Sequence, residues 1–181
     1  MRFTNAMAEE FVNKVAQSGI ITINLEEDFD KHEIVVFDIK DNLFQGLMLR
    51  EKDFREFVKE HDWEQYRDKN VSIICSADAI VPTWAYMLLV NQLSGIANFS
   101  IFGDKEALIT ALYMKAFAKI NPEEYNDARV VIKGCGDYPV PIAAYTEITR
   151  LLTPHVKSLM YGEPCSTVPI YKKKKEAVEA K

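Results

Sequence analysis

The chain is poor in the residues from which most recognisable sites are built. Its 181 residues include three cysteines, three histidines and seven glycines. No Gly-x-Ser-x-Gly, Gly-Lys-Ser phosphate loop or His-Glu-x-x-His motif occurs, and Gly134-Cys-Gly136 lacks the third glycine of a dinucleotide fingerprint. We therefore expect no nucleotide cofactor and none of these common enzyme classes.

Long apolar runs and clustered positive charge are scarce as well. The longest apolar segment, Ala79–Val90, is interrupted by Pro82 and is too short to cross a bilayer, and no signal peptide is apparent at the start. The net charge is −5, and the one basic run is Lys172–Lys175. These features predict a cytoplasmic protein without nucleic-acid or membrane partners. The odd number of cysteines argues against a disulfide framework.

The hydrophobic content of 48% is enough for one substantial core. We expect residues 1–171 to form a single α/β domain and 172–181 to be a disordered Lys-rich tail. Periodicity predicts elements in the first part of the chain: a helix over Thr4–Ser18, paired strands at Ile20–Leu25 and Glu33–Ile39, a possible strand at Leu43–Leu49, and a helix over Glu51–His61.

From Asn70 onward, strands and helices alternate regularly. The predicted strands are Val71–Cys75, Asn98–Phe102 and Arg129–Lys133, and the predicted helices are Pro82–Leu93, Asp104–Ile120 and Pro141–Leu152. This alternation is typical of βαβ crossovers. We therefore predict one largely parallel or mixed sheet with helices on both faces.

A partial internal repeat surrounds the cysteines. The segment from Cys75 to Tyr86 aligns with that from Cys135 to Tyr145, matching Cys, Asp, Val-Pro and Ala-Tyr, and Cys165 also precedes a Val-Pro pair. Composition alone predicts roughly 0.5 Val-Pro pairs, against the three present. Because Pro suits the first position of a helix and restricts the residue before it, Val-Pro makes a sharp turn from a loop into a helix. Packing in the core is the simpler explanation for the two tyrosines.

The cysteines are the candidate site. Cys75 and Cys135 follow alternating strands of the same predicted sheet, and the loop with Cys165 could fold over that edge, so three thiolates could converge. Such a set could bind zinc or an iron–sulfur cluster, with a fourth ligand from His155, Asp78, Asp137 or Glu163; His155 suits zinc best, and a carboxylate is the weaker candidate, for a cluster. The alternatives are separate structural cysteines or a reactive thiol, including a Cys135–His155–Asp137 catalytic arrangement.

Several long strings are similar to one bacterial family. Residues 37–47, 49–57, 75–86, 130–136 and 157–169 resemble the family catalogued as domain of unknown function 2480, over residues 18–173. That resemblance implies kinship and no particular reaction. It also implies a gene often near those for iron–sulfur cluster assembly, whose products would then be partners.

These observations lead to one main hypothesis and two alternatives. The main hypothesis is a cytoplasmic accessory protein that binds a metal or iron–sulfur cluster, or handles sulfur, through Cys75, Cys135 and Cys165. A metal-free protein-interaction module that docks a partner through aromatic and proline features of the C-terminal loops is the second. A thiol-dependent enzyme is the third.

Overall fold

The strands form two separate sheets. The computed structural model describes residues 19–134, 136–163 and 165–174. One sheet has the order β1-β5-β6-β7 and the other the order β2-β3-β4, and all neighbours are parallel except the antiparallel pair β6 and β7. The strands are β1 (Ile20–Asn24), β2 (Ile34–Asp38), β3 (Asn70–Ile74), β4 (Phe99–Phe102), β5 (Arg129–Lys133), β6 (Ser158–Glu163) and β7 (Ser166–Lys172).

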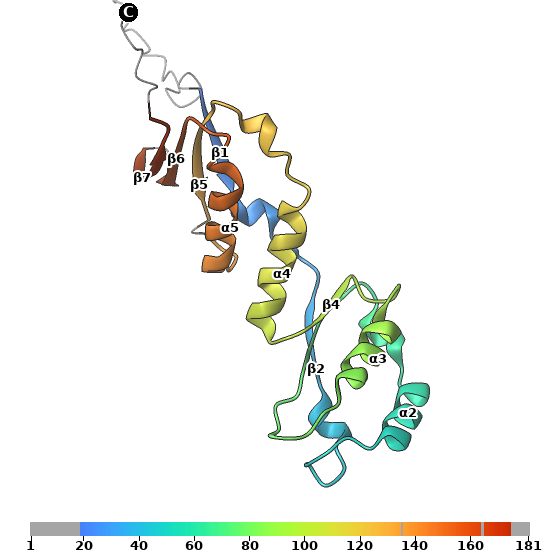
Figure 1. Cartoon of the computed structure of the whole chain (residues 1–181). Coiled ribbons are helices and arrows are strands. Elements are labelled where there is room, and N and C mark those ends of the chain that lie inside the picture. Colours follow the sequence, from blue (N-terminus) through green and yellow to red (C-terminus); the bar gives the residue numbers. More distant parts are fainter. Residues whose placement is uncertain (1–18, 135, 164, 175–181) are drawn as a thin grey trace, which may run out of the picture.

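Helices pack against both sheets, which confirms the predicted α/β class. They are α2 (Glu51–Glu60), α3 (Thr83–Leu93), α4 (Lys105–Phe117) and α5 (Ile142–Leu152), with single 3-10 turns η1 (Leu25–Asp28), η2 (Ile39–Asn42), η3 (Trp63–Tyr66) and η4 (Pro122–Tyr125). Figure 1 shows two lobes: β2 lies with α2 and α3 in one, and β1, β5, β6 and β7 lie with α5 in the other. None of the described helices combines the length and the apolar character needed to span a bilayer.

Each lobe has its own hydrophobic core. In the three-stranded lobe, Phe37, Val71 and Ile73 of the strands pack with buried side chains of α2 and α3 such as Phe54 and Leu89. The core of the four-stranded lobe is built from Val130, Ile132 and Leu159 of the strands, together with Ala144, Ile148 and Leu152 of α5 and Ile109, Tyr113 and Phe117 of α4. Helical spacing places the α5 residues on one face, as expected for a helix that covers a sheet.

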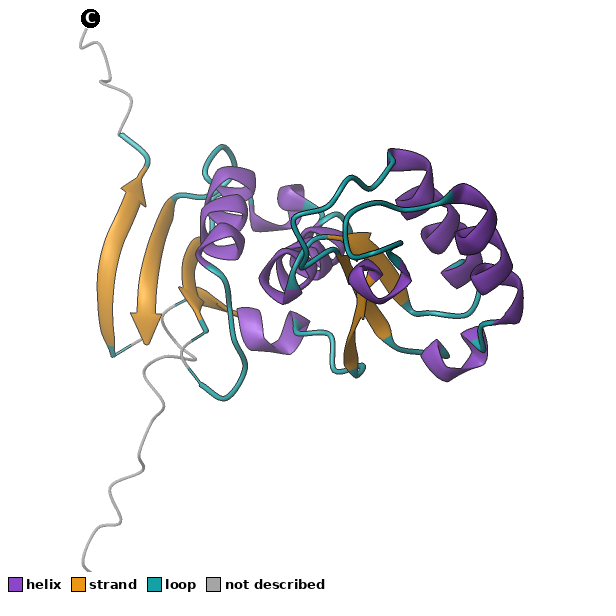
Figure 2. Ribbon diagram, turned by 90° about the horizontal axis from the view of Figure 1, so that it is seen from below, coloured by secondary structure: helices purple, strands orange, loops and turns teal. Residues whose placement is uncertain are grey.

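Helix α4 joins the two lobes. Ile109, Tyr113 and Phe117 belong to the core of the four-stranded lobe, while α4 also contacts β3 and β4 of the other sheet. Leu108 and Leu112 are buried too, so apolar side chains occupy more than one side of this helix. Figure 2 shows the two groups of strands as separate, with helices between them. A helix buried on two sides connects the lobes through packing rather than through a linker.

The two lobes are versions of one chain pattern, which extends the repeat seen in the sequence. Each runs strand, 3-10 turn, helix, 3-10 turn, strand, loop, helix, strand. The three-stranded lobe uses β2 to β4 without interruption, whereas the four-stranded lobe begins with β1 and η1 and resumes at α4. One copy of the pattern is therefore inserted within the other.

Local details of the two copies match. The side chains of Asp62 and Asn121 cap the turns η3 and η4. Asp68 and Asp127 then both have positive φ, 57° and 55°, and their amides donate to the carbonyls of Ile96 and His155. Positive φ is uncommon in residues other than glycine and is tolerated best by Asn and Asp. Its recurrence at equivalent positions supports the duplication.

The second halves of the copies match as well. The Tyr86 ring packs edge-on against Phe102, with centroids 4.8 Å apart, and the Tyr145 ring packs in the same way on Tyr161 at 5.6 Å. A glycine with positive φ follows each of these strand aromatics, Gly103 at 140° and Gly162 at 117°. The two tyrosines that the repeat aligned thus occupy the same place in each lobe.

Several expectations from the sequence need correction or lie outside the description. β1 and β2 do not pair with each other, because β1 pairs with β5 and β2 with β3. Residues 43–49 form a turn with an isolated bridge between Phe44 and Met48 rather than a strand. No strand was predicted after Leu152, where the structure has the β6–β7 hairpin. The predicted Thr4–Ser18 helix lies outside the described residues. The Lys-rich tail was predicted to begin at Lys172, but Lys172 ends β7 and the Lys173 amide donates to the Lys157 carbonyl. Residues 175–181 of that tail lie outside the description.

Candidate functional site

The loop between β5 and α5 is held on both sides of Cys135. Glu26 of η1 accepts hydrogen bonds from the amides of Gly136 and Asp137, and the Tyr145 hydroxyl donates to the Gly134 carbonyl at 2.7 Å. A Cβ atom at Gly134 would lie 2.8 Å from the Tyr145 oxygen, and one at Gly136 would lie 2.6 Å from Glu26. The close approach of these anchors explains both glycines. Cys135 itself lies outside the described residues.

The equivalent loop between β3 and α3 is anchored by Asp38. Its carboxylate accepts from the Ser76 amide at 3.0 Å, from the Ser76 hydroxyl at 2.5 Å and from the Lys40 amide at 3.1 Å. Partial burial raises the pKa of Asp38, but the hydrogen bonds from Ser76 and Lys40 outweigh it and lower the pKa to about 2. Asp38 is therefore ionised at neutral pH and fixes this loop to the end of β2.

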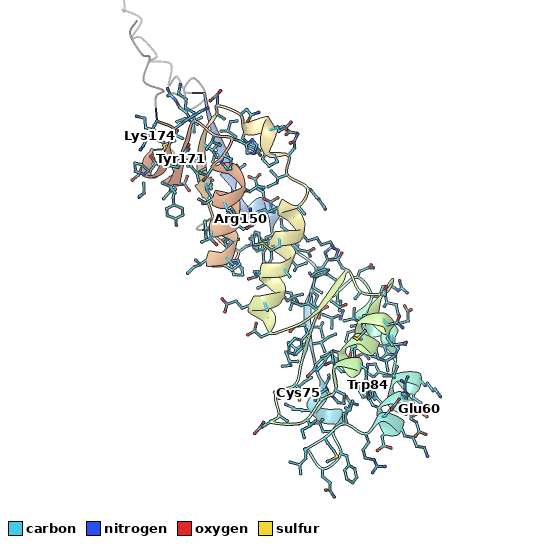
Figure 3. The ribbon with its side chains drawn as sticks, in the orientation of Figure 1. Glu60, Cys75, Trp84, Arg150, Tyr171 and Lys174 are labelled. Carbon is cyan, nitrogen blue, oxygen red and sulfur yellow. The ribbon has the colours of Figure 1, made fainter. Side chains whose placement is uncertain are left out.

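Cys75 is a half-buried thiol inside the three-stranded lobe. Its Sγ donates to the Ala77 carbonyl at 3.5 Å, and it packs against the core of that lobe. Burial, and next the nearby Cys75 thiol, raise the pKa of Tyr86. Figure 3 shows Cys75 in the lobe that also holds Trp84, far from Tyr171 of β7. Among its described contacts, Cys75 resembles a small core residue more than an exposed ligand.

The expectation that Cys75 and Cys135 follow strands of one sheet is wrong. Cys75 follows β3 of the three-stranded sheet, whereas the segment with Cys135 follows β5 of the four-stranded sheet. The alternation of strands and helices does not reveal that the β3-β4 pair and the β5-β6 pair belong to different sheets. Cys165 is exposed in the turn between β6 and β7.

The other predicted ligands are spread over both lobes. Asp78 lies in the loop after β3, and Asp137 lies in the loop after β5. His155 precedes β6, at the opposite end of the sheet from Asp137, and its Nδ1 lies 3.1 Å from the Asn126 side-chain oxygen. Glu163 pairs with Lys133 at 3.4 Å. Over the part of the chain that the structure describes, no three His, Cys, Asp or Glu side chains form a group that could hold a metal ion. The three-cysteine site stays a prediction, since Cys135 is not described.

An apolar hollow of about 330 Å³ lies beside α5, above β6 and β7. Its lining is almost entirely apolar: Ile132, Ile142, Tyr145, Thr149, Met160, Tyr161 and Ile170. Ile142 is 81% exposed and Ile170 is 52% exposed, and the nearby Val168, which pairs with Tyr161 across the hairpin, is 58% exposed. We call this surface, with its rim residues Ile142, Val168 and Ile170, the hairpin hollow. Exposed apolar groups gathered in this way mark a contact surface more often than single exposed residues do.

A cavity of about 430 Å³ with a mixed lining lies near the start of β4, and its polar border includes Asp30, Asn98, Lys115 and Lys119. Asp30 accepts hydrogen bonds from Asn70 and Asn98, and its pKa is lowered because these bonds and that from His32 outweigh burial. Asn70 begins β3 and Asn98 directly precedes β4, so this network ties the β1–β2 connection to the three-stranded sheet. We assign it a structural role.

The loop-anchoring carboxylates of Glu26 and Asp38 and the hairpin hollow were not identified from the sequence. Asp38 ends β2, and Glu26 lies two residues after the end of β1, so an acidic residue within or just after the first strand of each copy was the available signal. The hairpin hollow gave no signal, because no strands were predicted after Leu152 and the exposed apolar residues of β6 and β7 therefore had no shared face.

Comparison with known proteins gives one match. No curated protein and no solved structure matches the chain. A family model described as protein of unknown function (DUF2480) matches residues 9–173, which is most of the chain. The strings that resembled this family span both lobes and the hairpin, and the chain is a member of the DUF2480 family.

Proposed function

We propose that this protein is a cytoplasmic accessory protein that binds a partner protein through the hairpin hollow. The observation that carries the proposal is the set of exposed apolar side chains on the rim, of which Ile142 is 81% exposed. Leaving such groups in water forgoes stabilisation of about 25 cal/mol for each Å² that a partner would bury. A partner that covers the hollow recovers this energy.

The group that fills the hairpin hollow is an apolar side chain on the surface of a folded partner protein, and the partner's neighbouring side chains contact the rim. Pockets for small molecules enclose most of the ligand, whereas Ile142, Val168 and Ile170 protrude around a shallow hollow. Protruding apolar residues with aromatic neighbours such as Tyr145 and Tyr161 are typical of the centre of a protein interface.

Site-specific photo-crosslinking in the native cells tests the proposal. A benzoylphenylalanine at position 170 is expected to give a discrete adduct that the same probe at Glu60, on the exposed surface of α2, does not give. The adduct is identified by mass spectrometry, and the purified partner is titrated with wild type, Ile170→Glu and Val168→Lys. Binding at least tenfold weaker for both variants supports the proposal. An adduct shared with position 60, or unchanged binding, overturns it.

A second candidate is a thiol site for metal, an iron–sulfur cluster or sulfur, with the products of iron–sulfur assembly genes as partners. It is favoured by the exposure of Cys165 and by the parallel pairing of β5 and β6, since the segments that follow these strands leave the sheet at the same edge. In this form the site uses Cys135 and Cys165, and Cys75 of the other sheet is not a ligand.

Elemental analysis and a visible spectrum test this candidate in protein made anaerobically with iron and zinc supplied. Stoichiometric metal is expected in wild type and in Cys75→Ser, and loss is expected in Cys135→Ser and Cys165→Ser. Wild-type protein without metal ends the metal form of the candidate. Labelling with iodoacetamide near pH 6 then tests the reactive-thiol form, which requires Cys165 or Cys135 to react faster than Cys75.

A further inference from the structure

The two copies of the chain pattern differ at one edge of their sheets. In the four-stranded lobe, the outer edge of β6 is covered by the antiparallel strand β7. The equivalent strand of the three-stranded lobe is β4, which pairs with β3 and has no second neighbour among the described residues. The same edge is therefore occupied in one lobe, while in the other no described residue pairs with it.

The surface beside the open edge matches the surface that β7 covers. Phe102 occupies the place of Tyr161, and Val90 of α3 occupies the place of Thr149 of α5. Phe102 is 65% exposed, and Met87 on the same helix is 68% exposed. In the four-stranded lobe, Ile170 of β7 lines the hollow formed by the corresponding residues. The three-stranded lobe has the apolar walls of this arrangement without the strand that completes it.

The backbone of β4 is suited to pairing. The Gly103 amide donates inward to the Ile73 carbonyl, so by strand alternation the amides of Ser100 and Phe102 point away from β3. Phe99–Phe102 contains no proline and no charged residue. The outer edge of β7 differs, because Pro169 removes a donor there and lysines follow the strand. Proline and lysine are devices that protect an edge strand, and β4 has neither.

From this difference we propose that β4 binds an extended segment of a partner protein, which adds to the sheet as an antiparallel strand in the place that β7 takes in the other lobe. The segment presents apolar side chains at alternate positions to Phe102 and Met87, as β7 presents Val168 and Ile170 on the four-stranded lobe. Backbone hydrogen bonds supply affinity in such strand addition, and the side-chain surface supplies selectivity. This site is separate from the hairpin hollow and does not depend on it.

The chain's own β7 provides a probe for the experiment. A synthetic peptide covering residues 165–173, with the change Pro169→Val to restore a donor, is titrated into the isotopically labelled full chain. The amides of Ser100 and Phe102 are expected to shift and to exchange with solvent at least tenfold more slowly. The amides of β7 are expected to stay unchanged.

Matched variants make the result decisive. Phe102→Lys puts a charge beside the open edge at an exposed position and should weaken peptide binding at least tenfold, whereas Val36→Lys, at an exposed position of β2 on the opposite edge of the same sheet, should leave it unchanged. Unaltered amides of Ser100 and Phe102 at saturating peptide overturn the proposal. Self-association that protects these amides without peptide, and that Phe102→Lys abolishes, also overturns it, because the occupant is then a second copy of the chain.

Discussion

His61 is enclosed by aromatic side chains at the end of α2. Its ring centroid lies 4.7 Å from both Phe57 and Trp63, and its Nε2 lies 3.1 Å from the Tyr66 hydroxyl. Burial lowers the pKa of His61, and the charge of Asp62 opposes this only in part. The folded chain therefore holds this histidine neutral at a pH where the unfolded chain takes up a proton.

This difference predicts that stability decreases in mild acid. Because the pKa of His61 in the folded chain is below its ordinary value of 6.5, the stability is full above that pH and falls as the pH is lowered through it. The urea midpoint of the wild type is expected to be lower at pH 5 than at pH 7.5. His61→Gln should lose most of this dependence, and His155→Gln should keep it. A wild-type slope retained in His61→Gln would contradict the assignment.

The Asp38 carboxylate predicts a separate response in stronger acid. Asp38→Asn weakens the anchor of the loop after β3 and should lower the free energy of unfolding by about 1 kcal/mol at pH 7. Since the pKa of Asp38 is lowered to about 2, its contribution is present above pH 3.8 and is lost as the pH falls toward 2.

Urea denaturation at a series of pH values measures the gap between wild type and Asp38→Asn. The gap is expected to narrow below pH 3.8. Asp41→Asn, in the same turn but with its side chain exposed, is the control and should change stability by less than about 0.5 kcal/mol. A gap that is equally wide at pH 3 and pH 7 would show that the charge of Asp38 does not stabilise the loop.

At the scale of elements, the turn from β4 into α4 requires a glycine. Gly103 has a φ of 140°, and a Cβ atom there would lie 2.8 Å from the Cβ of Ala107. Gly95, at the end of α3, also has positive φ, but a Cβ atom at that position meets nothing within 4 Å. A side chain at either position would strain the backbone, but only at position 103 would it also clash with a neighbouring atom.

Gly103→Ala is therefore expected to destabilise the protein more than Gly95→Ala, by roughly 2 against roughly 1 kcal/mol. Chemical denaturation of the two variants provides the comparison. Gly162→Ala, at the equivalent position of the other copy, should behave like Gly103→Ala, because its Cβ would lie 2.7 Å from the Ser166 carbonyl oxygen. Equal effects of Gly95→Ala and Gly103→Ala would mean that α4 shifts freely at its start.

The sequence predicted the elements better than their arrangement. The strand Arg129–Lys133 was predicted at its observed bounds, and the helix after Pro82 to within one residue, because a buried apolar run and Pro at a helix start are local signals. Pairing of β1 with β5 joins residues more than a hundred positions apart, and no local signal carries it. The β6–β7 hairpin was missed because Pro169 and the exposed Val168 and Ile170 do not give the usual strand alternation.

For the candidate site as well, the local features were predicted better than their arrangement in space. The repeat around Cys75 and Cys135 correctly identified two equivalent loops between a strand and a helix. It led to the wrong expectation of one sheet, since two copies of a pattern can pack side by side in one sheet or build separate lobes. The outcome depends on long-range strand pairing, here that of β1 with β5 and of β2 with β3. Both β1 and β2 extend the sheet of their own copy, and the acidic segment between β1 and β2 gave no indication of these pairings.

At the scale of the whole molecule, the insertion of one copy within the other couples the lobes. The chain enters the three-stranded lobe from η1 and returns through α4, so both connections begin or end in the four-stranded lobe. Helix α4 also supplies Tyr113 to the core of the four-stranded lobe, where burial and then Asp28 and Glu26 raise the pKa of that side chain to about 12. Its hydroxyl has no hydrogen-bond partner among the described residues, so packing holds this helix in place.

This coupling predicts that the two lobes unfold together. Both tryptophans, Trp63 and Trp84, lie in the three-stranded lobe, so their fluorescence reports on that lobe alone. Leu159→Ala creates a cavity in the other core and should cost about 2–5 kcal/mol. If α4 couples the cores, tryptophan fluorescence and far-ultraviolet circular dichroism shift to the same lower urea midpoint in this variant. An unchanged fluorescence midpoint beside a lowered dichroism midpoint would instead mean that the three-stranded lobe folds on its own and that α4 does not transmit stability between the copies.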